Sequence, residues 1–299
     1  MSAPFLTPSV IALLDKVNAN AGPPDYRPEV QRAALNGAMA ALGWSGNGTA
    51  DELVDLDSGA TIHIYLPDAA DAASTIVYIH GGSFIAGGAS SHGPLARSLA
   101  DRTGRIVALV DYRLAPEHLA PAACDDCVAA VRKLAERGVE RLAIVGDSAG
   151  GALAAATALA VRGSVRPALL FLINPMISPA ANFDGSLREY SHGFFAGADD
   201  FAAGWDAYRG GGGFGTLDDL LAFDDLPGLP PTIILTNEVD PVRDQGEHFA
   251  EKLSAAGITT LSLRARGLIH AAWLFPKALP EAELLLGIIA GSLRTALGA

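Results

Sequence analysis

Short apolar runs recur along the chain, each bounded by glycine, proline or polar residues. Six of them are nearly continuous, as is typical of strands that are buried on both faces of a parallel sheet. They cover residues 75–79, 106–110, 142–145, 168–173, 232–235 and 259–263. Residues 61–66 alternate between apolar and polar positions instead, which predicts a half-buried strand.

Helical segments separate the predicted strands. They cover residues 94–103, 121–137, 150–162 and 246–256. This alternation predicts an α/β fold whose sheet is parallel, with right-handed crossovers and helices on both faces. Open sheets of this kind carry their active sites at the carboxyl ends of the strands. Catalytic residues are therefore expected in the loops that follow the predicted strands.

Two regions fall outside this alternation. Residues 1–50 predict two helices, one with apolar residues at helical spacing within 10–17 and a second at 28–42. The interval 178–226 is rich in aromatic residues and contains four glycines at 210–213. No Gly-Lys-Ser/Thr follows these glycines, so they favour a flexible hinge over a phosphate-binding loop. The aromatic side chains either line an apolar pocket or pack against the body of the protein, and the sequence leaves both open.

Composition and charge narrow the class of protein. The 299 residues are 50% apolar and 18% charged, which indicates a globular chain with a large core. The formal charge of −12 argues against nucleic acid or an anionic membrane surface as a partner. The N-terminus lacks the pattern of a secretory signal, and no apolar run approaches about 18 residues. We therefore expect a cytoplasmic protein without a membrane span.

The two cysteines, Cys124 and Cys127, are spaced as in redox-active and zinc-binding motifs. No second pair of cysteines or histidines with ligand spacing accompanies them. We therefore interpret them as partly buried thiols on a helix, without a redox or metal-binding role.

The strongest chemical signal is the segment G-D-S-A-G-G at 146–151. It follows a predicted strand and precedes a predicted helix, which is the context of a nucleophile elbow. The tight turn explains Gly146 and Gly150, since side chains there would meet the neighbouring strand and helix. The elbow would present the Ser148 hydroxyl at a helix N-terminus, whose N–H groups favour developing negative charge. Ser148 is therefore the predicted nucleophile.

A serine nucleophile needs a base, and the base needs a carboxylate that orients it. His270 is the candidate base because it lies in a loop after the last predicted strand. Asp240 is the candidate acid because it follows the predicted strand 232–235, and Glu238 and Asp244 are its alternatives. The other histidines lack a position that favours this role; they are His63, His80, His92, His118, His192 and His248. The order Ser148, Asp240, His270 is that of nucleophile, acid and base in α/β-hydrolases.

The oxyanion formed by attack on an ester carbonyl needs preorganised donors, each of which contributes roughly 3–4 kcal/mol. The segment H-G-G-S-F at 80–84 follows a predicted strand and is similar to the H-G-G-G loop that supplies such donors. Ser83 replaces the third glycine, which keeps a backbone N–H but loses the freedom of glycine to adopt positive φ. We expect Gly82, Ser83 and Ala149 to donate, with Gly81 as the substitute candidate.

Together these motifs resemble the hormone-sensitive-lipase-like family of carboxylesterases, also called bacterial family IV, within the α/β-hydrolases. The chain also contains D-Y-R-L-A-P-E-H at 111–118, G-L-P-P at 228–231 and D-P-V-R-D at 240–244, all similar to blocks of that family. The resemblance covers residues 51–299 and is most specific between 76 and 151.

The resemblance implies an α/β-hydrolase catalytic domain over 51–299, with a helical cap formed by residues 1–50 and an insertion at about 180–225. It implies the same roles for Ser148, Asp240 and His270, and gives the block 111–118 a structural role beneath the site. It implies a small-molecule ester as substrate and no metal or organic cofactor. The acidic balance and small apolar cap favour a short-chain neutral ester over an emulsified fat.

Several alternatives stay open at this point. The family usually follows its histidine with Gly-Phe, whereas this chain has Ala271-Ala272-Trp273. The same triad would also serve amide, lactone or carbamate hydrolysis, and some relatives on this fold bind ligands without turnover. An aspartate-nucleophile dehalogenase or epoxide hydrolase is disfavoured because position 148 is serine. If residues 259–263 form an edge strand, they would be able to pair in a homodimer.

Overall fold

The computed structural model describes residues 5–19, 22–68, 71–179, 185–210 and 219–298. Within these ranges the strands form one sheet, in the order β1-β2-β4-β3-β5-β6-β7-β8. The strands are β1 (Glu52–Asp55), β2 (Thr61–Tyr65), β3 (Asp71–Ile79), β4 (Arg105–Asp111), β5 (Arg141–Asp147), β6 (Leu169–Ile173), β7 (Thr232–Val239) and β8 (Thr260–Ile269). Strands β3 to β8 are parallel, whereas β2 pairs antiparallel with β4 and with β1. The predicted α/β fold with a mostly parallel sheet is confirmed.

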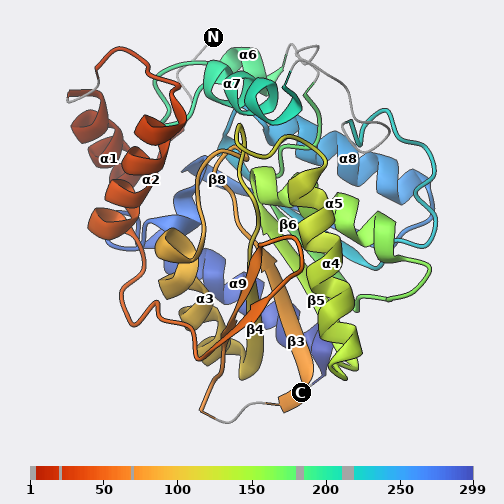
Figure 1. Ribbon diagram of the computed structural model, residues 1–299. Helices are drawn as coiled ribbons and strands as arrows, with labels where there is room; N and C mark the ends of the chain where they lie inside the picture. Colours follow the sequence, from red (N-terminus) through yellow and green to blue (C-terminus); the bar gives the residue numbers. More distant parts are fainter. Residues whose placement is uncertain (1–4, 20–21, 69–70, 180–184, 211–218, 299) are drawn as a thin grey trace.

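Helices cover both faces of the sheet (Figure 1). One face packs against α3 (Ala89–Thr103) and α9 (Glu281–Leu297), and the other against α4 (Ala122–Glu136), α5 (Ala149–Val161) and α8 (Arg243–Ala255). This three-layer arrangement explains why the central strands are apolar on both faces.

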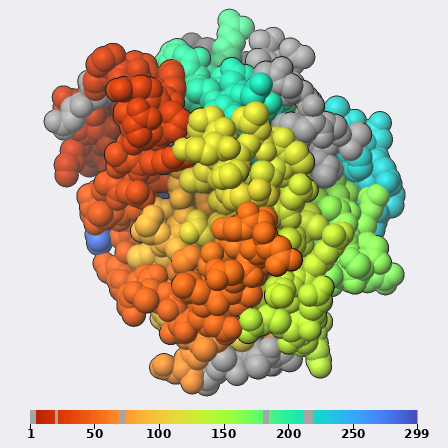
Figure 2. Space-filling model, in the orientation of Figure 1, coloured from red at the N-terminus to blue at the C-terminus, as the bar shows by residue number. Residues whose placement is uncertain are grey.

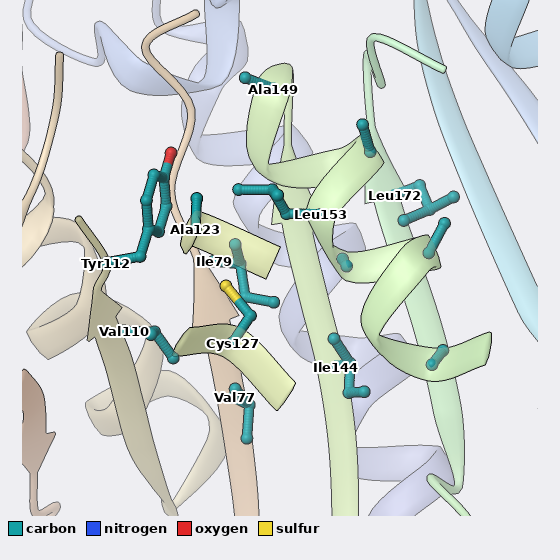
Figure 3. Close-up of a cluster of buried hydrophobic side chains, with 14 of the residues drawn as sticks. Val77, Ile79, Val110, Tyr112, Ala123, Cys127, Ile144, Ala149, Leu153 and Leu172 are labelled. Atoms are coloured by element: carbon teal, nitrogen blue, oxygen red, sulfur yellow. The ribbon is translucent and has the colours of Figure 1, made fainter. Parts of the chain in front are cut away.

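Successive side chains of each central strand point into different hydrophobic cores, one on each face of the sheet. In Figure 3, Val77 of β3, Val110 of β4 and Ile144 of β5 point toward Cys127 of α4 and Leu153 of α5. The residues between them belong to the core beneath α3 and α9; they include Ile76, Leu109 and Val145. All of these strand residues are fully buried, at roughly 1.5–3 kcal/mol for each Val, Leu or Ile side chain.

In the described part of the chain, four helices lie beyond the carboxyl ends of the strands. They are α1 (Pro8–Ala19), α2 (Pro28–Leu42), α6 (Ser186–Glu189) and α7 (Ala198–Arg209). In Figures 1 and 2 the N-terminal segment (red) and the segment of α6 and α7 (green to teal) lie at the same end of the molecule. Of the glycines expected to form a hinge, Gly210 ends α7 with φ 58°, whereas 211–213 lie outside the described residues.

Several boundaries differ from the prediction. Strand β1 was not expected, and β7 and β8 continue well past their apolar runs. Strand β8 lies at the sheet edge and tolerates polar residues such as Arg264 and Arg266. Strand β7 continues through Thr236 and Asn237, whose buried side chains are hydrogen-bonded. Helix α3 begins at Ala89, before Pro94. Helix α9 follows the last strand, so the alternation of strands and helices did not indicate it. Its buried positions at helical spacing are a signal that would have done so.

Candidate active site

The turn between β5 and α5 carries Ser148. Its backbone has φ 52° and ψ −120°, a combination that L residues rarely adopt. A Cβ at Gly146 would lie 2.2 Å from the carbonyl oxygen of Gly150, and one at Gly150 would lie 2.1 Å from that of Ile79. The turn therefore closes only with glycine at both positions, and it places Ser148 at the N-terminus of α5.

Ser148, His270 and Asp240 form a chain of two hydrogen bonds. The Nε2 atom of His270 lies 3.0 Å from Ser148 Oγ, and its Nδ1 lies 2.8 Å from Asp240 Oδ2. Because a carboxylate only accepts hydrogen bonds, His270 donates through Nδ1, which leaves Nε2 as the acceptor for the serine hydroxyl. Asp240 also accepts hydrogen bonds from the backbone N–H of Val242 at 2.9 Å and from the amide of Asn174. Ser148, His270 and Asp240 are all buried.

His270 is held on several sides. It directly follows β8, and Asn237 on β7 donates to the carbonyl oxygen of Ile269 at 2.6 Å. The Phe201 ring of α7 meets the imidazole edge-on, with centroids 5.0 Å apart. Ala271 adopts φ 62°, a left-handed conformation that favours glycine. The chain therefore keeps the turn after His270 although it lacks the glycine usual in the family.

The structure places the two alternative acids away from His270. Glu238 accepts a hydrogen bond from the backbone N–H of Gly267 at 2.9 Å. Asp244 forms an ion pair with Arg243 at 2.7 Å and accepts from the N–H of Ser186 at 2.8 Å, where α6 begins. Both carboxylates thus hold other parts of the chain, whereas Asp240 contacts His270.

The loop after β3 adopts an unusual backbone. Gly82, Ser83 and Phe84 have φ of 118°, 53° and 65°. Ser83 and Phe84 are L residues in the left-handed region, which costs each of them of order 1–3 kcal/mol. Ser83 therefore adopts the positive φ that the loop requires, although the replacement of glycine gave reason to doubt this. Among the described residues, none accepts a hydrogen bond from the N–H of Gly82 or Ser83.

Gly81 differs from its neighbours because its N–H is already used. It donates to Asp147 Oδ1 at 3.1 Å, and the Tyr78 hydroxyl donates to the same oxygen at 2.7 Å. A Cβ at Gly81 would lie 2.4 Å from Asp147 Oδ2. These contacts tie the loop at 80–84 to the residue that precedes Ser148, and they count against Gly81 as a donor to an oxyanion.

Sequence reasoning gave Asp147 no role, yet the structure places it beneath the site. Its carboxyl is fully buried, and this burial raises its pKa to about 6 although the hydrogen bonds from Tyr78 and Gly81 lower it. An acidic residue directly before the predicted nucleophile, at the end of a buried strand, is the signal that would have drawn attention to it.

The block 111–118 supports the loop from below. The Tyr112 hydroxyl donates to the carbonyl oxygen of His80 at 2.8 Å, and the two rings stack with centroids 4.2 Å apart. Burial lowers the pKa of His80, whose Nδ1 donates to the carbonyl oxygen of Gly81 at 2.8 Å. Glu117 forms an ion pair with Arg32 of α2 at 2.7 Å, which connects the block to the N-terminal helices. No described residue of this block lines the pocket that opens onto Ser148 and His270.

A pocket of about 370 Å³ opens onto Ser148 and His270. Its apolar lining includes Ala34, Leu35, Ala38, Ile85, Phe195, Phe201 and Trp273. Aromatic residues of the insertion thus take both of the roles that the sequence left open. Phe195 and Phe201 line the pocket, whereas Trp205 and Tyr208 pack against Phe84 with ring centroids 4.7 and 4.3 Å away.

The cysteines are free thiols on α4. Cys127 is buried and Cys124 half-buried, and burial raises the pKa of Cys124 to about 12 and that of Cys127 well above its ordinary value. The two thiols lie on a helix as predicted, but Cys127 is fully buried and not partly buried as expected. In the described part of the chain, no three His, Cys, Asp or Glu side chains are grouped so that they would hold a metal ion. None of the described helices is both long and apolar enough to span a bilayer.

The chain belongs to the α/β-hydrolase family. A family model described as the alpha/beta hydrolase fold matches residues 76–274. Within that fold the resemblance to the hormone-sensitive-lipase-like family IV is confirmed.

Named relatives agree with this assignment. Carboxylesterase NlhH of Mycobacterium tuberculosis is 35% identical over 80% of this chain and 79% of its own length. An arylesterase of Saccharolobus solfataricus is 31% identical over 76% of this chain and 78% of its own length. An alpha/beta hydrolase enzyme from the metagenome of Lake Arreo is 29% identical, with a TM-score of 0.89 over 99% of both chains. The predicted enzyme class, a carboxylic ester hydrolase, is confirmed.

Proposed function

We propose that this carboxylic ester hydrolase cleaves short-chain acyl esters through an acyl-enzyme intermediate on Ser148. The observation that carries the proposal is the pair of hydrogen bonds joining Ser148, His270 and Asp240, of which Ser148 and His270 line an apolar pocket. A serine in an apolar pocket is by itself a weak nucleophile. A base aligned on the serine hydroxyl and oriented by a buried carboxylate activates it for attack.

Acylation begins when Ser148 Oγ attacks the ester carbonyl carbon while its proton moves to His270 Nε2. The imidazolium then faces Asp240, whose carboxylate stabilises the positive charge and holds the ring in place. His270 returns the proton to the leaving alcohol as the bond from carbon to the alcohol oxygen breaks. In deacylation, water attacks the acyl-enzyme, His270 takes its proton, and the proton returns to Ser148 Oγ as the carboxylic acid leaves.

The oxyanion formed in both steps is bound by backbone N–H groups. We assign this role to Gly82, Ser83 and Ala149, because Gly81 already donates to Asp147. Ala149 is the first residue of α5, so its N–H has no acceptor within the helix. Ser83 carries a backbone φ that glycine would adopt at lower cost, which indicates that the loop is held in this conformation by its surroundings.

The pocket limits the acyl chain. A volume of about 370 Å³ is at the small end of ligand sites, and it is bounded by α2 and α7. We therefore assign residues 1–50 and the insertion at about 180–225 to a cap that closes over the catalytic domain, residues 51–299. The cap favours short esters over long chains.

A series of p-nitrophenyl esters of increasing acyl length tests this function. Activity is expected to peak at about two to six carbons, because the pocket buries only a short chain. Ser148→Ala is expected to remove hydrolysis, with circular dichroism as the check that the variant folds. Full hydrolysis by Ser148→Ala would contradict the mechanism, whereas an optimum beyond about ten carbons would contradict only the substrate size.

A further inference from the structure

Among its described lining residues, the pocket at Ser148 has carboxylates but no lysine or arginine. The ionisable side chains among its described lining residues are His92, Asp147, Asp200 and His270. Burial, with His80 nearby, lowers the pKa of His92 well below its ordinary value, so this ring is neutral. Asp147 lines the pocket too, but its Oδ1 already accepts hydrogen bonds from Tyr78 and Gly81. Asp200 is thus the carboxylate in the pocket wall that takes no part in the contacts of Ser148, His270 and Asp240.

Asp200 lies in the first turn of α7 and is half-buried. Its Oδ2 accepts a hydrogen bond from the backbone N–H of Gly197 at 2.7 Å, at the start of the helix. This contact fixes the position of the carboxylate group at the start of α7. Within the described ranges no lysine or arginine pairs with Asp200, and none lines the pocket. A substrate in the pocket therefore meets a carboxylate whose charge no side-chain cation neutralises.

The rest of the wall suits an organic cation. Phe195, Phe201 and Trp273 line the same pocket as Asp200. Aromatic faces attract ammonium groups, and the attraction grows when water is excluded. The protein as a whole carries a formal charge of −12, which also draws cationic substrates toward it. Aromatic rings and one carboxylate together are complementary to an alkylammonium group.

We propose that Asp200 is a specificity determinant, which favours esters that carry a positively charged group and disfavours anionic esters. The inference rests on the proposed esterase function and assigns a substrate class to the same pocket. A charge placed several ångströms from Asp200 in a partly water-filled pocket changes the transition-state free energy by about 1.4 kcal/mol, which corresponds to about a tenfold change in kcat/KM.

Two pairs of esters of equal shape isolate the charge. Acetylcholine and 3,3-dimethylbutyl acetate differ by a positive charge on the alcohol side. Mono-p-nitrophenyl glutarate and p-nitrophenyl 5-methylhexanoate differ by a negative charge on the acyl side. In each pair the ratio of kcat/KM, charged over neutral, is the measured quantity. Because both substrates meet the same enzyme preparation, the ratio does not depend on the fraction of protein that is folded.

Asp200→Asn keeps an oxygen that accepts from Gly197 and removes the charge. We expect it to lower the acetylcholine ratio or raise the glutarate ratio by about tenfold, and the change to shrink as salt rises to about 1 M. The matched control is Asp199→Asn, since Asp199 is exposed on the same helix and does not line the pocket. It is expected to leave both ratios near those of the wild type. A purely structural role of Asp200 in capping α7 would lower both members of a pair equally.

The outcomes separate the two proposals. If Asp200→Asn leaves both ratios unchanged, or if Asp199→Asn changes them as much, Asp200 is not a specificity determinant. If Ser148→Ala hydrolyses the neutral esters as fast as the wild type, the proposed function itself is wrong.

Discussion

Gly204 of α7 packs directly on Ser83, in the loop at 80–84 that follows β3. A Cβ added at Gly204 would lie 2.6 Å from Ser83 Cβ and 2.8 Å from its carbonyl oxygen. Helix α7 and the loop that would bind the oxyanion thus meet without room for one methyl group. A helix of the insertion therefore fixes the position of a loop that lies far away in the sequence.

This contact predicts that Gly204→Ala disturbs catalysis. Alanine favours a helix by roughly 1 kcal/mol over glycine, but here its methyl group would displace Ser83 or push α7 outward. We expect kcat for p-nitrophenyl butyrate to fall by roughly tenfold or more, since one misplaced oxyanion donor costs several kcal/mol.

The control for this variant is Gly287→Ala, on the exposed side of α9, where a Cβ would meet nothing within 4 Å. It is expected to raise the melting temperature and leave kcat unchanged. Equal kcat values for Gly204→Ala and Gly287→Ala would show that the packing of α7 on the loop has no catalytic consequence.

The orienting acid is tested by a pair of isosteric substitutions. Asp240→Asn keeps the shape but changes the hydrogen bond to His270, and we expect kcat to fall by about 10³–10⁴-fold. Asp244→Asn is expected to retain most of kcat, because Asp244 contacts Arg243 and Ser186. Steady-state kinetics with one p-nitrophenyl ester measures both. A greater loss in Asp244→Asn than in Asp240→Asn would reverse the assignment.

The burial of Asp147 predicts that the free energy of unfolding depends on pH. Burial raises the pKa of this carboxyl to about 6 from an ordinary value of 3.8. Its neutral form is therefore favoured by the fold, and the folded state loses up to about 3 kcal/mol as the pH rises from about 4 to about 6. Asp147→Asn lacks this titration, so its stability relative to the wild type should rise across the same window. Urea unfolding at several pH values measures the difference, and a difference that stays constant with pH would contradict this interpretation.

The edge of the sheet predicts self-association. Strand β8 is the last strand in the sheet order, and Leu261 on it is 50% exposed. Unpaired backbone groups on an edge strand favour pairing with another strand, so we propose a homodimer through β8. Leu261→Lys is expected to shift the protein toward the monomer in sedimentation velocity. Leu284→Lys, at a leucine that is 68% exposed on α9, is the control. A wild type that sediments as a monomer, or equal shifts in both variants, would count against the dimer.

Much of the fold could be predicted because parallel strands buried on both faces leave continuous apolar runs. The runs that became β3, β4, β5 and β6 lie in the middle of the sheet, where most buried side chains are apolar. The edge strands β1 and β8 were missed or shortened, because water on one face permits residues such as Arg264 and Arg266. Edge strands therefore carry a weaker apolar pattern than strands that are buried on both faces.

The part of the candidate site that could be predicted from the sequence lies in one short segment whose residue types are required by its own local geometry. The turn around Ser148 requires Gly146 and Gly150 locally, and its residues are contiguous. The contacts of Asp147 and Gly204 join distant segments, so only the assembled fold brings them together. The same applies to Asp200, whose place in the pocket depends on how α7 packs over the sheet.

The central claim, that Ser148 is the nucleophile activated by His270, is tested most directly by mapping a covalent adduct. The protein is incubated with diethyl p-nitrophenyl phosphate, digested and analysed by mass spectrometry. We predict loss of activity in step with a single diethylphosphoryl group on Ser148, and much slower labelling of His270→Ala. Inactivation with the adduct on another residue, or labelling of Ser148 at the same rate without His270, would contradict the account.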